Sequence, residues 1–202
     1  ALHAAAPIVK GLTDGAVDAV YKKLFSFDIT RASFLSRGSG FGGKVAERLE
    51  DITHDSEQIK FRKNFLKVWV AKVFTADYTD PKTFEYFDKV GIMHTGQAGF
   101  KHREKKSPLH VDYTHCAILL GYVQSMLTSA VMAQDLPDET KTAVLVAINK
   151  VMWIQNDLFA RHYINPSSTP IATKISKEVT NAMPVAIFSL AAGLSYLLFV
   201  RG

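Results

Sequence analysis

Residues 81–96 read PKTFEYFDKVGIMHTG, and this stretch decides the fold. Pro81 is typical of the first position of a helix, and Gly96 is typical of the residue that ends one. The positions of one helical face recur at spacings of three and four: Phe84, Phe87, Val90, Gly91 and His94. The sequence therefore predicts a helix that begins after Asp80, ends before Thr95 and carries a histidine on an apolar face.

The rest of the chain shows the same helical periodicity, and strand signals are weak. Apolar residues at spacings of three and four predict long helices that begin at Pro7, Asp55, Pro108 and Pro137, and a short one at Asp28. Asp55 and Gln58 have the spacing of a capping box at the start of the second long helix. The glycine-rich segment 37–55 is expected to be mainly a loop. The chain is thus expected to be all-α.

The composition of the 202 residues, with 48% hydrophobic and 21% charged side chains, is typical of a globular protein. Cys116 is the single cysteine, which excludes an internal disulfide framework and favours a reducing compartment. Residues 38–43 match G-x-G-x-x-G by letter, but no strand is expected before them, so nucleotide binding is not expected.

The formal net charge of +5 is mild and is not gathered on one face, so we expect no nucleic-acid partner. The densest basic run covers residues 101–106. It is interpreted either as a solvated loop or as a local site for an anion, such as the carboxylates of a bound ligand.

The C-terminal part of the chain differs from the rest. Residues 1–164 are expected to form the folded domain, residues 165–178 a linker, and residues 179–202 an apolar segment. A helix from Pro184 to Val200 would be roughly 25 Å long, close to the hydrocarbon thickness of about 30 Å. We expect a single membrane anchor through residues 182–200. The alternative is a helix buried in this protein or docked on a partner.

His94 is the candidate for chemistry. An axial haem ligand needs a neutral imidazole on an otherwise apolar wall. Gly91, one turn earlier, is expected to leave room for a flat ring, and Tyr21 on the first helix offers a polar group for the opposite wall. The alternative is a core histidine whose nitrogen atoms are satisfied by hydrogen bonds.

Three stretches carry a resemblance to a known family: VYKKL at 20–24, FLKVWV at 65–70 and FDKVGIMHTG at 87–96. They are similar to the protoglobin and globin-coupled-sensor branch of the globins. LHVDY at 109–113 and WIQNDLFA at 153–160 resemble the single-domain fungal members. The resemblance covers residues 7–164 and implies a globin-like helical fold.

The resemblance also implies a function and a site. It implies a protein that binds haem b and reversibly binds O2, CO or NO, with His94 as the proximal ligand of the iron and Tyr21 as the distal hydrogen-bond donor. The other implied haem-binding residues are three on the distal helix and two beside the proximal histidine: Phe61, Phe65, Trp69, Val90 and Gly91. Family members often dimerise through their last two long helices, so a homodimer is expected among the partners.

A second interpretation keeps the fold and changes the function. The chain would then be a globin-fold accessory or scaffold subunit of a membrane complex, with or without haem, in which Trp69 or Trp153 fills the pocket. The sequence shows no distal His–Arg pair that would support haem-based NO dioxygenase or peroxidase chemistry. We therefore do not expect an enzyme. We expect an intracellular, membrane-associated protein with its haem domain on a reducing side, the mitochondrial membranes being one candidate location.

Overall fold

The computed structural model describes residues 1–35 and 40–164 and is all-α over these residues, as predicted. Its α-helices are α1 (Leu2–Phe25), α2 (Asp28–Ala32), α3 (Glu57–Thr75), α4 (Pro81–His94), α5 (Tyr113–Met132) and α6 (Asp138–Ile164). Short 3-10 helices cover Ser33–Leu35, Leu49–Asp51 and Lys101–Arg103. An isolated antiparallel bridge pairs Thr95 with His110.

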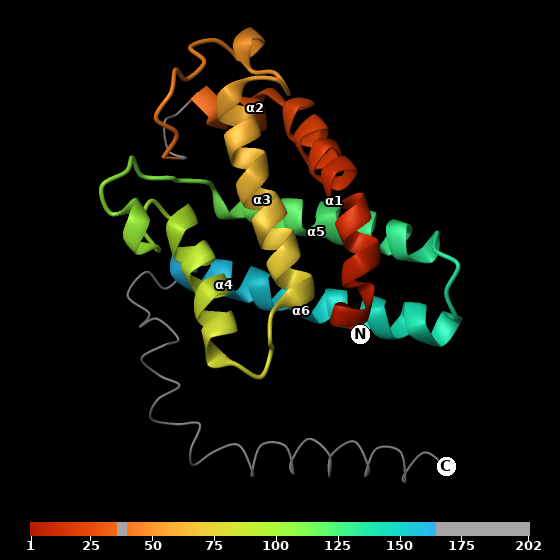
Figure 1. Cartoon of the computed structure of the whole chain (residues 1–202). Coiled ribbons are helices and arrows are strands. Elements are labelled where there is room, and N and C mark those ends of the chain that lie inside the picture. The colour runs from red at the N-terminus through yellow and green to blue at the C-terminus, as the bar shows by residue number, and fades with distance from the viewer. Residues whose placement is uncertain (36–39, 165–202) are drawn as a thin grey trace, which may run out of the picture.

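The helices are arranged in two crossing groups (Figure 1). α1 and α3 lie side by side and cross α5 and α6, which run alongside each other. α4 packs on the C-terminal half of α6. Among the largest fully buried side chains are Phe74 and Ile59 of α3, Phe87 of α4, and Ile148 and Met152 of α6. The core thus draws on both groups and on α4, and Phe87 lies on the apolar face predicted for α4.

The predicted bounds of α4 are confirmed. The Asp80 carboxylate accepts a hydrogen bond from the backbone N–H of Lys82 at 2.9 Å, and Pro81 occupies the first helical position. The helix ends at His94, as expected. These signals are local, so the sequence alone is sufficient to place this helix.

The predicted starts of α1 and α5 are wrong. α1 begins at Leu2 and contains Pro7, because the alanines before the proline are strong helix formers and extend the helix toward the N-terminus. α5 begins at Tyr113 and not at Pro108. The backbone N–H of Val111 donates to the carbonyl oxygen of His94 at 2.9 Å, which holds the residues before α5 in an extended conformation.

The predicted capping box of α3 is also wrong. The helix begins at Glu57, and the buried Gln58 side chain accepts from the backbone N–H of Ala46 at 3.0 Å and donates to the carbonyl oxygen of Phe34 at 3.3 Å. Gln58 therefore ties the long loop before α3 to the core, because the amide satisfies backbone groups on two separate segments.

The predicted linker at 165–178 and the apolar segment at 179–202 lie outside the described residues. Among the described helices, α5 is long and apolar enough to cross a membrane by length and composition. Core helices of globular domains pass the same test, and α5 packs along α6.

Candidate functional site

His94 lies half-buried at the C-terminal end of α4. Its Nδ1 atom donates to the carbonyl oxygen of Val90, 2.7 Å away, which leaves the lone pair of Nε2 as the free ring acceptor. The ring packs against Phe159 in a T-shaped arrangement, with the ring centroids 5.1 Å apart. Burial lowers the pKa of His94, and the charges of Arg103 and Arg62 lower it further. The imidazole is thus held neutral, which is the form that binds a metal ion.

Gly91 serves a different purpose from the one expected. A Cβ atom at this position would lie 2.5 Å from the carbonyl oxygen of Leu158 on α6. The glycine therefore lets the backbones of α4 and α6 approach closely, and the expectation that it leaves room for a flat ring is wrong. Val90, also buried, contributes its carbonyl oxygen to the His94 hydrogen bond.

Tyr21 lies on α1 and is buried. Its ring contacts Phe25 and Phe34, with centroid separations of 6.0 and 5.8 Å. Among the described residues, no hydrogen-bond partner of the Tyr21 hydroxyl is found. Burial raises the pKa of this hydroxyl well above its ordinary value, so it keeps its proton and remains a donor.

Two arginines connect the surroundings of Tyr21 and His94. The guanidinium of Arg62, on α3, lies 5.0 Å from the centroid of the Phe34 ring, and its charge acts on both Tyr21 and His94. Arg103 is buried and donates to the carbonyl oxygen of Ser107 at 3.2 Å. Its charge also acts on His94, and burial together with this charge lowers the pKa of Arg62. The two guanidiniums thus raise the positive potential near the histidine.

The basic run at 101–106 divides into two kinds of residue. Arg103 turns inward, and its neighbours in the run are exposed. The exposed neighbours agree with a solvated loop, and the anion site stays a prediction. Arg62 was missed from the sequence because it has no distinctive spacing, and only the packing of α3 against α1 brings it to this region.

The three aromatic residues expected on the distal helix all lie on α3. The Phe61 and Phe65 rings are 4.9 Å apart, edge to face, and the Phe65 side chain is 49% exposed. The indole N–H of Trp69 donates to Oε1 of Gln155 on α6 at 3.1 Å. Phe61 and Phe65 are therefore available as an apolar wall, while Trp69 ties α3 to α6.

Haem fits the chemistry of these groups. It is a flat apolar molecule with two carboxylates and an iron that takes an imidazole nitrogen. His94 presents a neutral imidazole with a free Nε2, Arg62 and Arg103 provide positive charge near it, and Phe61 and Phe65 provide apolar surface.

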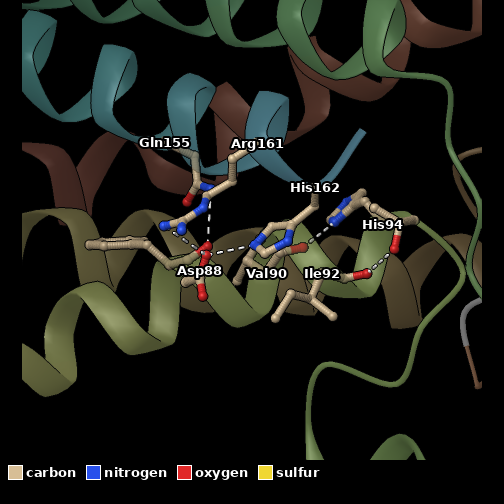
Figure 2. A network of polar contacts seen from close by, with 9 residues as sticks. Asp88, Val90, Ile92, His94, Gln155, Arg161 and His162 are labelled. Atoms are coloured by element: carbon tan, nitrogen blue, oxygen red, sulfur yellow. Dashed lines mark hydrogen bonds and ion pairs between the residues drawn. The ribbon is translucent and has the colours of Figure 1, made fainter. Parts of the chain in front are cut away.

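A second polar site, a pair of side chains, lies between α4 and α6. Asp88 and His162 are both buried, and Nε2 of His162 lies 2.6 Å from Oδ1 of Asp88 (Figure 2). Neither residue was predicted from the sequence to have a role. Asp88 occurs within the stretch that resembles the family, but its partner is 74 residues away, so only the fold shows the pair.

Comparison with known proteins tests the resemblance. No curated protein matches the chain. The sequence matches the family described as Protoglobin over residues 1–169, which includes every helix described above. The match thus spans the histidine at the end of α4, the tyrosine on α1 and the helices between them. The chain belongs to the protoglobin family.

Proposed function

We propose that the chain binds haem b, with Nε2 of His94 as the proximal ligand of the iron, and reversibly binds O2, CO or NO. The observation that carries this proposal is the hydrogen bond from Nδ1 of His94 to the Val90 carbonyl. It fixes the tautomer and the orientation of the ring and makes Nε2 a better electron donor. A globin-type fold and the membership of the protoglobin family support the same function.

Each of the other site residues has a role in this proposal. Arg62 and Arg103 would attract the haem carboxylates, because charge-assisted hydrogen bonds to guanidinium groups are strong. Phe61 and Phe65 would cover apolar parts of the ring. The haem, when bound, supplies the iron at which diatomic gases bind. The buried Tyr21 hydroxyl would donate a hydrogen bond to the gas, and we propose a gas-binding protein rather than an enzyme.

An absorption spectrum tests the proposal. The purified full-length chain is titrated with haem, and the reduced protein is then exposed to CO. We expect an intense near-ultraviolet band that saturates at one haem per chain and shifts when CO is added. A chain that binds no haem would contradict the proposal and favour the scaffold interpretation. Trp153 would not fill a pocket in that case, because its side chain is 63% exposed on α6.

We also infer that the chain is tethered to a membrane through residues 182–200, with the haem domain on the reducing, intracellular side. The support comes from the sequence, because residues 179–200 carry no charged side chain and the domain has a single, buried cysteine. Cell fractionation of the full chain tests the tether, and the truncation described below tests which segment provides it.

A homodimer through α5 and α6 is the partner that we propose for the domain itself. Large apolar side chains are exposed on both helices, including Ile118 at 67% and Trp153 at 63%. A shallow surface groove beside Trp153 is lined by residues of α5, among them Gly121, Gln124 and Ser125. Sedimentation of the domain before and after Trp153→Glu tests this association, which the charged side chain should abolish.

A further inference from the structure

We propose that Asp88 and His162 are a positioning pair, which fixes the proximal helix α4 on α6 and thereby sets the strain on the bond between His94 and the haem iron. The proposal rests on the haem function proposed above. It assigns a task to two residues that do not contact the gas.

The two side chains form a buried charge-assisted contact. Asp88 is 2% exposed and His162 is 6% exposed, and their Oδ1 and Nε2 atoms are 2.6 Å apart. Nη1 of Arg161, the preceding residue on α6, lies 4.0 Å from the same carboxylate oxygen. A buried carboxylate is costly unless it is paired and hydrogen-bonded, so α4 is held where these α6 groups can reach it.

The pair lies beside a close approach of the two helices at Gly91. Gly91 lies one turn after Asp88 and one turn before His94, and a Cβ atom there would be 2.5 Å from the Leu158 carbonyl oxygen. The same Cβ would be 3.3 Å from Cδ2 of His162, so the His162 ring packs beside the crossing as well as on the carboxylate. Figure 2 shows Arg161 and His162 reaching Asp88 from α6, with His94 farther along α4.

The other end of the crossing is held by the residue after His162. The Tyr163 hydroxyl lies 2.9 Å from the carbonyl oxygen of His94, and the His94 ring packs against Phe159 in a T-shaped arrangement. α6 thus holds α4 before and after Gly91, and the helix has little freedom to tilt. Because packed interiors transmit small displacements, a change at Asp88 should move the His94 imidazole relative to the haem.

A role in stability alone makes a different prediction. Loss of the pair would then lower the unfolding temperature and leave the bond between iron and imidazole unchanged. The frequency of the iron–histidine stretching vibration in the reduced, gas-free protein separates the two roles, because it reports the strain and orientation of that bond and not the stability of the fold.

The experiment compares the haem-loaded full chain with Asp88→Asn, His162→Gln and the double variant. Asp88→Asn preserves the shape of the side chain, and His162→Gln retains an N–H that can donate to the Asp88 carboxylate. We therefore expect each single variant to fold. The matched control is Val144→Ala, which removes buried volume from α6 near its other end. Resonance Raman spectra, haem transfer to an excess of apomyoglobin, and thermal unfolding are measured on all five proteins.

We expect both single variants to shift the iron–histidine frequency and to speed haem loss by about tenfold to a hundredfold. The double variant should shift the frequency no further than the larger single shift, because the two residues act as one unit. Val144→Ala should lower the unfolding temperature without a frequency shift. Unchanged frequencies in Asp88→Asn and His162→Gln would overturn the positioning role while leaving haem binding intact. A wild-type chain that takes up no haem would instead overturn the haem function, and with it this proposal.

Discussion

The imidazole of His94 directs its Nδ1 proton to the carbonyl oxygen of Val90, one turn earlier on the same helix, at 2.7 Å. This side-chain hydrogen bond lies within the last turn of α4. It selects the tautomer that leaves Nε2 free. The tautomer of the histidine that we propose as the haem ligand is therefore set by a residue four positions earlier in the sequence.

Tyr21→Phe should weaken the retention of O2. The change removes one hydroxyl donor and preserves the ring that packs on Phe25 and Phe34. A hydrogen bond to partly anionic O2 contributes roughly 1.5–3 kcal/mol, so O2 should dissociate about one to two orders of magnitude faster. CO carries less charge, and its dissociation rate should change little. Stopped-flow measurements with both gases check this, and equal effects on both would show that Tyr21 only packs.

Gly91→Ala should destabilise the domain. The added methyl group meets the Leu158 carbonyl at 2.5 Å, which forces α4 and α6 apart at a cost of about 1–3 kcal/mol. The matched control is Gly121→Ala in α5, where an added Cβ has nothing within 4 Å. It should stabilise the helix by about 0.5–1 kcal/mol, because alanine loses less backbone entropy than glycine. Urea unfolding of both variants measures the difference, and equal midpoints would refute the close-approach argument.

Cys116 should resist alkylation in the folded protein. Burial raises the pKa of its thiol to about 11. At pH 8 only about one thiol in a thousand would then be ionised, and the thiolate is the reactive form. Iodoacetamide should therefore modify the native chain far more slowly than the urea-unfolded chain at the same pH. Equal rates in the two states would show that the thiol is accessible at the surface of α5.

Truncation after Ile164 should separate the haem domain from its tether. The shortened chain should be soluble and show the same absorption spectrum as the full chain, because the described helices end at this residue. The full chain should sediment with membranes and require detergent for extraction. A full chain that stays soluble and monomeric without detergent would rule out the anchor and indicate that residues 182–200 pack on protein.

The sequence was sufficient to predict those elements whose bounds depend on neighbouring residues. Asp80 and Pro81 form a cap from adjacent residues, so the start of α4 could be predicted, and the threefold and fourfold spacing placed His94 on the correct helix. The starts of α1 and α5 could not be predicted from their prolines. Pro7 is tolerated inside a helix that the preceding alanines extend toward the N-terminus. The hydrogen bond from the Val111 N–H to the His94 carbonyl keeps the residues before Tyr113 out of α5.

The parts of the site that escaped prediction depend on contacts between distant segments. Gly91 carries no sign in the sequence that it faces Leu158 rather than a ligand. Arg62 approaches His94 only because α1, α3 and α4 are packed into one domain, and Asp88 pairs with a residue 74 positions away. Such pairings follow from the three-dimensional arrangement of the helices, which periodicity alone does not specify.

The most direct test of the account is a haem titration of His94→Ala beside the wild-type chain, followed by addition of imidazole. Wild type should bind one haem per chain with the spectrum of an imidazole-ligated iron. His94→Ala should bind haem weakly and exchangeably, and free imidazole should restore the wild-type spectrum by occupying the space left by the side chain. A variant with unchanged haem stoichiometry and an unchanged spectrum before imidazole is added would contradict the axial role of His94.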